Sequence, residues 1–132
     1  MSYDLTIKAD ETYSRMTSKS GLCTFIAQLP GIKPNGGSGF VLDERPKRWM
    51  EIDLEVIEED GYKLQEAGRD YDAINCISLH IPYPFLGDAI ERHYLPTAFA
   101  IADHLDWQLY DEQIGEDISR EPRTRKPWWR FW

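Results

Sequence analysis

The stretch Arg-Trp-Met-Glu-Ile-Asp-Leu-Glu-Val-Ile-Glu, residues 48–58, has the most regular alternation in the chain. Its apolar side chains occupy every second position: Met50, Ile52, Leu54 and Val56. Between them lie an aromatic residue and three carboxylates: Trp49, Glu51, Asp53 and Glu55. Successive side chains of a β-strand point to opposite faces. The pattern therefore predicts a strand with one face for the core and an opposite face that presents acidic groups.

Four further segments predict strands. Tyr3–Ile7 and Asn75–Ile81 show the same two-residue period, with apolar residues on one face only. Phe40–Leu42 and Trp107–Tyr110 are short and largely apolar, and the first of them should form a hairpin with the 48–58 stretch. Between these strands, residues 33–39 read as a glycine-rich loop, and residues 59–72 as a polar surface connection.

Two amphipathic helices are also predicted. The first has apolar residues at helical spacing (Leu22, Phe25, Ile26 and Leu29), and Thr17, Ser18 or Ser20 is available as its N-cap. Pro30-Gly31 should end it. The second should begin near Leu95, because proline at position 96 suits the first turn of a helix.

The order strand, helix, hairpin, strand, helix, strand predicts an α+β fold. We expect a two-layer sandwich, with a mostly antiparallel sheet of four or five strands and two helices on one face, as a ferredoxin-like variant. Residues 1–114 should form one domain, followed by a basic, tryptophan-rich tail at residues 115–132. Two helices suffice for one face, so the other should meet solvent, the tail or a partner.

Charge is divided unevenly along the chain. The net charge is −8, and residues 120–132 carry five basic groups and one acidic group, which leaves −12 on residues 1–119. An acidic body repels nucleic acid and anionic membranes, and it favours a basic protein as partner. Cys23 and Cys76 have neither a disulfide framework nor a zinc spacing, so both should be reduced. Without an apolar run long enough to span a membrane, a cytoplasmic location is expected.

The carboxylates of the 48–58 stretch are the first candidate site. Glu51, Asp53 and Glu55 would lie roughly 7 Å apart along one strand face. Such a row suits a solvated surface, a divalent-cation site or a docking surface for a basic partner. Metal ligands converge on the ion, whereas side chains of one straight strand point in parallel.

His80 is the second candidate, because it shares a predicted strand face with Ser78 and Cys76. A nucleophilic Cys/His or Ser/His arrangement is one interpretation, and a structural histidine is the other. Residues four apart on a strand are about 13 Å apart, so His80 can contact only a group on a neighbouring strand. The glycine loop lacks the Gly-Lys-Ser/Thr of a phosphate cradle and follows a helix, so it is interpreted as a turn.

The tail combines basic and aromatic residues: Arg123, Arg125, Lys126 and Arg130 with Trp128, Trp129, Phe131 and Trp132. Three interpretations remain open for it. It packs against the protein itself or a second copy, which would give a homodimer; it contacts a partner; or it binds nucleic acid or membrane.

Residues 49–55, 74–82 and 98–113 together resemble a group of small, acidic bacterial proteins of uncharacterised function. In size, acidity and α+β design the chain is also similar to the immunity proteins that bacteria make against their own secreted toxins. This resemblance implies a non-enzymatic protein-binding module, an immunity-type inhibitor that covers a basic toxin site. No catalytic, metal-binding or cofactor-binding residue follows from it.

We expect seven residues to bind the partner: Trp49, Glu51, Asp53, Glu55, His80, Trp128 and Trp129. The alternative is a small metal-dependent enzyme or accessory protein that uses His80 with Asp53 or Glu55. A third hypothesis is a structural or regulatory subunit that dimerises through the tail.

Overall fold

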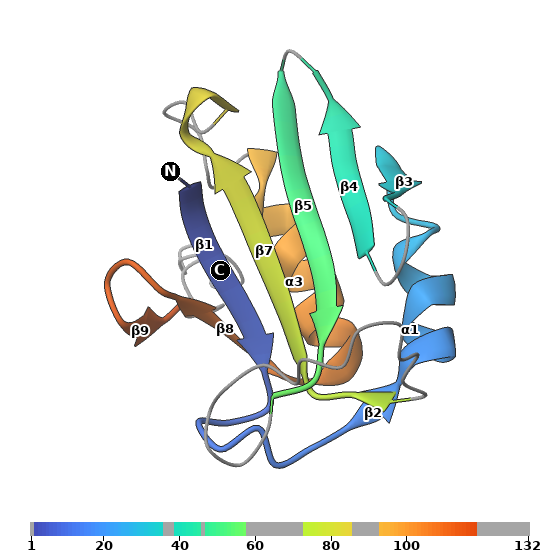
Figure 1. Ribbon diagram of the computed structural model, residues 1–132, viewed down its shortest axis with the longest axis vertical. Helices are drawn as coiled ribbons and strands as arrows, with labels where there is room; N and C mark the ends of the chain where they lie inside the picture. Colours follow the sequence, from blue (N-terminus) through green and yellow to red (C-terminus); the bar gives the residue numbers. More distant parts are fainter. Residues whose placement is uncertain (1, 36–38, 46, 58–72, 86–92, 119–132) are drawn as a thin grey trace, which may run out of the picture.

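A computed structural model of the chain describes residues 2–35, 39–45, 47–57, 73–85 and 93–118 (Figure 1). Seven strands of the described chain form one sheet: β1 (Ser2–Lys8), β3 (Ile32–Pro34), β4 (Gly39–Glu44), β5 (Arg48–Glu55), β7 (Cys76–Pro82), β8 (Gln108–Asp111) and β9 (Glu116–Asp117). Their order is β3-β4-β5-β7-β1-β8-β9, and each neighbouring pair is antiparallel. A separate pair joins β2 (Thr17–Ser18) to β6 (Ala73–Ile74).

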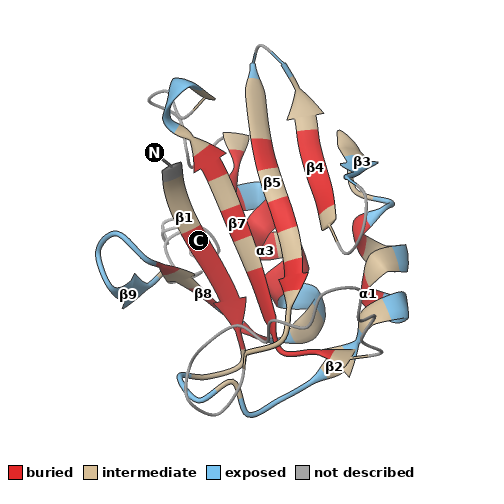
Figure 2. Ribbon diagram, in the orientation of Figure 1, coloured by how far each residue is buried: buried red, intermediate tan, exposed pale blue. Residues whose placement is uncertain are grey.

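Residues 48–55 of this stretch form the predicted strand, β5, which lies between β4 and β7. Met50, Ile52 and Leu54 are buried, whereas the alternate residues from Trp49 to Glu55 are half-buried on the opposite face (Figure 2). Val56 lies just after the strand and is half-buried. The alternation of apolar and polar residues in the sequence therefore correctly predicts which face of β5 is buried.

The other four predicted strands are present as β1, β4, β7 and β8, and β4 forms the predicted hairpin with β5. The prediction of four or five strands is wrong, because β3 and β9 extend the sheet at its two ends. Lys33 and Pro34 belong to β3, whereas the sequence predicted a loop there. Strands of two or three residues are too short to show a period, and proline is accepted in an edge strand, where its missing N–H is not needed.

Two helices of the described chain, α1 (Lys19–Ile26) and α3 (Leu95–Leu105), match the predicted pair. Ser18 is the N-cap of α1, where its Oγ accepts a hydrogen bond from the backbone N–H of Gly21. The helix ends at Ile26, before the predicted stop at Pro30-Gly31. Helix α3 ends at Leu105, and its C-cap residue, Asp106, adopts the left-handed conformation with φ of 58°.

Gly31 lies in the turn that leads into β3, and its φ is +78°. Its carbonyl oxygen accepts a hydrogen bond of 2.9 Å from the backbone N–H of Asp43. A Cβ at this position would lie 2.9 Å from Cδ1 of Leu42 and 3.0 Å from the carboxyl group of Glu44. Both the backbone conformation and the space therefore require glycine here.

The core lies between the apolar sheet face and the helices. Leu22 and Ile26 of α1 and the buried residues of α3 belong to one cluster with the inward residues of β1, β4, β5, β7 and β8. The rings of Phe25 and His104 stack at 3.8 Å and join the two helices. Figure 1 shows α3 behind the sheet, and no helix of the described residues lies over the face toward the viewer.

Neither helix in the described ranges has the length and apolar character that crossing a bilayer requires.

Candidate functional site

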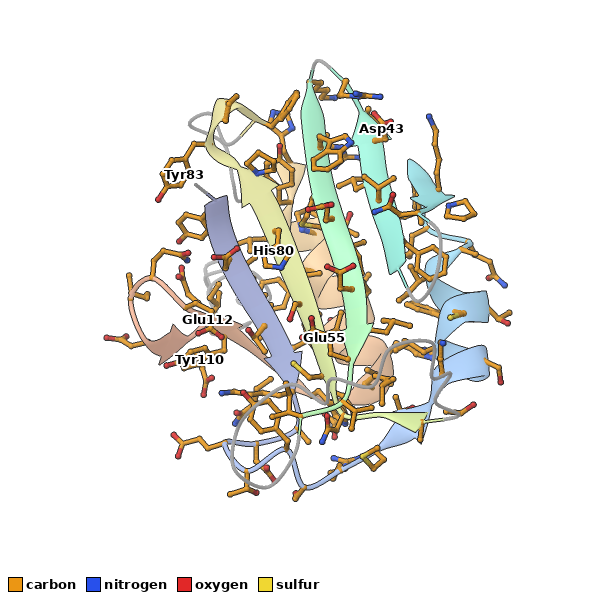
Figure 3. The ribbon with its side chains drawn as sticks, in the orientation of Figure 1. Asp43, Glu55, His80, Tyr83, Tyr110 and Glu112 are labelled. Atoms are coloured by element: carbon orange, nitrogen blue, oxygen red, sulfur yellow. The ribbon has the colours of Figure 1, made fainter. Side chains whose placement is uncertain are left out.

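Strand register places polar side chains from four strands on the face opposite the core, which we call the polar face. It carries three carboxylates of β5 (Glu51, Asp53 and Glu55), three residues of β7 (Cys76, Ser78 and His80) and three of β1 (Asp4, Thr6 and Lys8). Tyr110 of β8 lies opposite Thr6, and Glu112 follows directly after that strand. Figure 3 shows Glu55, His80, Tyr110 and Glu112 on this side of the sheet.

A row of three carboxylates and one histidine runs across the strands. Glu51 lies directly opposite His80, and His80 lies directly opposite Asp4. The backbone N–H of Glu112 donates to the carbonyl oxygen of Asp4 at 3.2 Å, which brings Glu112 to the next position. Because neighbouring strands are about 4.8 Å apart, the four residues span about 14 Å. The sequence predicted a row along β5, and the register adds this second row at right angles to it.

His80 lies directly opposite Glu51, so the strand that carries it does neighbour the acidic strand β5. Its hydrogen bond, however, joins Nδ1 to Oδ1 of Asp4 at 2.5 Å, and both side chains are more than a third exposed. A carboxylate accepts hydrogen bonds, so Nδ1 of His80 is the donor in this contact. Asp53 lies opposite Ser78, not opposite His80. The alternative hypothesis of a metal-dependent enzyme used His80 with Asp53 or Glu55, whereas the hydrogen bond in the structure joins His80 to Asp4.

The carboxylates of β5 do not converge. Ser78 Oγ donates a hydrogen bond of 2.7 Å to Oε1 of Glu55. Within the described ranges, no group of three or more His, Cys, Asp and Glu side chains is arranged to hold a metal ion. Side chains that point in parallel from one strand account for this geometry.

At one end of the polar face, the loop after β1 covers Lys8. Nζ of Lys8 lies 4.1 Å from the ring centroid of Tyr110 and 5.3 Å from that of Tyr13, and the residue is only 7% exposed. Cation–π contact with two rings stabilises a charge that is largely removed from water. Asn75 holds this loop, because its Nδ2 donates to the carbonyl oxygen of Tyr13 at 3.2 Å.

Asn75 also ties the end of β5. Its Nδ2 donates to the carbonyl oxygen of Ile57 at 2.9 Å, and its Oδ1 accepts from the backbone N–H of Ile57 at 2.7 Å. The side chain is buried, with 4% of the residue exposed. Every polar atom of this buried amide therefore has a protein partner, as buried polar groups require.

Cys76 occupies the polar face but is buried beneath its neighbours. Burial, with the nearby charge of Glu55 as a smaller cause, raises the pKa of its thiol to about 12. A thiol with this pKa stays protonated at neutral pH, and the thiolate is the nucleophilic form. The geometry therefore gives no support to a Cys/His nucleophile.

Trp49 lies at the opposite end of the polar face from Lys8. Its ring is 6.2 Å from that of Phe85, with an angle of 39° between the planes, and its backbone N–H donates to the hydroxyl of Tyr94 at 3.2 Å.

Asp43 of β4 is the partner of Trp49 in the neighbouring strand. Nε and one terminal nitrogen of Arg45 contact the two oxygens of Asp43 at 2.9 and 3.1 Å. These hydrogen bonds lower the pKa of Asp43.

The structure thus brings together five of the seven predicted partner-binding residues: Trp49, Glu51, Asp53, Glu55 and His80. Trp128 and Trp129 lie outside the described residues, as does the basic part of the predicted tail. Sequence reasoning missed Asp4, Glu112 and Asp43 as members of the same surface. The alternation in residues 3–7 placed Asp4 on a polar strand face, but only the pairing of distant strands places it beside His80.

Comparison with protein-family models found no match, and comparisons with curated proteins and with solved structures found no significant similarity. The function is therefore inferred from the residues of the polar face.

Proposed function

We propose that the protein is a non-enzymatic protein-binding module, an immunity-type inhibitor whose polar face covers a basic site on its partner. One observation carries this proposal: five carboxylates share the polar face (Asp4, Glu51, Asp53, Glu55 and Glu112). Among the described residues of β1, β5, β7 and β8, Lys8 is the only lysine or arginine on that face, and it is enclosed between two tyrosines. At the Trp49 end of the face, Lys33 and Arg45 are basic, and both pair with Asp43.

The physical basis is charge complementarity. A surface of one sign steers an oppositely charged partner toward it and disfavours partners of the same sign. Trp49 supplies an aromatic group at the edge of the acidic rows, and tryptophan is among the residues that contribute most to binding at protein interfaces. A reaction centre would need carboxylates that converge or a reactive thiolate. The carboxylates of β5 point in parallel and the Cys76 thiol stays protonated, which agrees better with recognition of a partner by a broad surface.

The strand order supports the finer fold assignment, a two-layer sandwich that is a ferredoxin-like variant. Helix α1 lies in the chain between β1 and β5, which are separated in the sheet by β7. Helix α3 lies between β7 and β8, which are separated by β1. Two such split β-α-β units characterise that arrangement, and β3, β4 and β9 would be additions to it.

A cytoplasmic location also belongs to this proposal, supported by the two free cysteines.

A pull-down from the native host with the full-length protein tests the proposed function. The partner should be a basic protein, and Glu51→Gln with Asp53→Asn should weaken its binding at least tenfold, about 1.4 kcal/mol. Asp103→Asn with Asp106→Asn removes the same charge from α3 and its cap, and asparagine tolerates the left-handed conformation at 106. Equal retention of the partner by both double variants would count against the polar face as the binding site.

Calorimetry with divalent cations separates this function from the metal-dependent alternative. The proposed binding module should give no heat with zinc, manganese or magnesium. Heat that is lost in Asp53→Asn with Glu55→Gln would favour a metal-dependent enzyme or accessory protein instead.

A further inference from the structure

The polar face has a distinct corner, formed by Trp49, Glu51 and Asp43. Glu51 is the next residue after Trp49 on the same strand face, at a distance of about 7 Å. Asp43 lies directly across from Trp49 on β4. An indole ring is therefore flanked by one carboxylate along its strand and by another on the neighbouring strand.

We propose that this corner recognises arginine side chains of the basic partner in preference to lysine. The inference rests on the proposed function, and it names the chemistry that the partner must present. A guanidinium would lie against the ring of Trp49 and donate two hydrogen bonds to the carboxylate of Glu51. A lysine ammonium is a strongly hydrated point charge and cannot match both contacts at once.

Two features of the corner favour a planar cation. First, the ring of Trp49 is held from one side by Phe85, and its backbone by Tyr94, so little conformational freedom remains to be lost on binding. Second, the protein's own Arg45 already forms the two-pronged contact with Asp43, although the arginine side chain is 60% exposed. The side chain of Asp43 itself is only 15% exposed, and Nζ of Lys33 also lies 3.9 Å from its Oδ2. The contact with Arg45 therefore shows that a guanidinium fits against a carboxylate of this corner, and Glu51 is the carboxylate assigned to the partner.

Neighbouring charges extend the site. His80 separates Glu51 from Asp4, and these two carboxylates are two strands, roughly 10 Å, apart. A second basic group of the partner can contact Asp4 and Glu112 while the first occupies Trp49. Attraction to these outer carboxylates does not distinguish arginine from lysine, because it depends on charge alone. The preference for arginine is therefore assigned to Trp49 and Glu51.

The test uses the full-length protein and two fluorescein-labelled peptides of equal length, one alternating arginine with glycine and the other lysine with glycine. Fluorescence anisotropy measures both affinities at two salt concentrations. The arginine peptide should bind roughly fivefold to tenfold more tightly, the range expected of a partly desolvated cation–π contact. Trp49→Leu should abolish this preference and leave the binding of the lysine peptide nearly unchanged.

Two further variants make the result specific. Tyr83→Leu removes an exposed aromatic side chain just beyond the end of β7, and it should leave the preference intact. Trp49→Phe keeps a ring in place and should retain part of the preference, which also covers the case in which Trp49→Leu does not fold. Equal affinity of both peptides for the unaltered protein would overturn this inference alone. Binding of neither peptide would overturn it together with the proposed basic partner.

Discussion

Replacement of Gly31 by alanine should destabilise the protein by about 1 to 4.5 kcal/mol. The left-handed backbone conformation at φ of +78° costs an L-residue about 1–2 kcal/mol. The new Cβ would lie 2.9 Å from Cδ1 of Leu42, whose side chain is fully buried and cannot retreat without disturbing the core. Overpacking of this kind costs about 1–3 kcal/mol. The lower entropy of the unfolded alanine chain offsets about 0.4–1 kcal/mol of the total.

The same replacement at Gly21 should have the opposite sign. Gly21 lies in the first turn of α1, and among the described residues a Cβ there would meet only Ser18, with Oγ at 3.6 Å and Cβ at 3.8 Å. These are ordinary contacts, and alanine is better than glycine in a helix by about 0.5–1 kcal/mol. Gly21→Ala is therefore a matched control that changes the chain by the same methyl group.

Urea unfolding followed by far-UV circular dichroism measures both effects as differences in the free energy of unfolding. Gly31→Asn separates the two causes, because asparagine tolerates the left-handed conformation but keeps the Cβ contact with Leu42. A loss of less than about 0.5 kcal/mol in Gly31→Ala, which is the scatter typical of neutral surface changes, would show that glycine is not required at this position. A destabilising Gly21→Ala would refute the helix assignment around that residue.

Other predictions concern three sets of groups: Asn75, the two cysteines and Asp10. Asn75→Asp should cost about 2–4 kcal/mol of stability, because a carboxylate cannot donate to the two carbonyls that the amide contacts, and urea unfolding measures the loss. A thiol reagent at neutral pH should modify the half-buried Cys23 first and Cys76 only on unfolding. The pKa of Cys76 is raised from 9.0 to about 12. The contribution of this buried thiol to stability is therefore present below pH 9 and is lost as the pH rises toward 12. Unfolding measured at several alkaline pH values follows this loss. Hydrogen bonds, first of all that from the Ser14 side chain, lower the pKa of Asp10 from 3.8 to about 2. This stabilisation is present above about pH 3.8 and is lost as the pH falls through 2; Ser14→Ala should move the pKa, measured by NMR, back toward its ordinary value.

Sequence periodicity predicted the fold wherever an element was long enough to show a period. The eight residues of β5 and the seven of β7 alternate over several cycles, and the proline at position 96 marked the start of α3 within one residue. The edge strands β3 and β9 form only because a neighbouring strand offers hydrogen-bond partners, so nothing in their own residues distinguished them from turns.

The candidate site was predictable only in part for the same reason. The carboxylates of β5 share a face through local geometry, which the alternation reveals. Asp4 and His80 are 76 positions apart in the chain and meet through the pairing of β1 with β7. The enclosure of Lys8 by Tyr13 and Tyr110 likewise depends on a loop and on a distant strand. Long-range register, rather than residue type, decided which charged groups became neighbours.

The two ends of the described sheet bear on its behaviour at high concentration. The strand at one end has three residues and finishes with Pro34, and the strand at the other end has two residues, Glu116 and Asp117, both exposed. Short, proline-bearing or charged edges offer little backbone for another strand to pair with, and they protect β-proteins from edge-to-edge aggregation. The sheet of the described residues therefore offers little backbone for further strands to pair with at either end. Other molecules can contact it through the side chains on its face rather than through its edges.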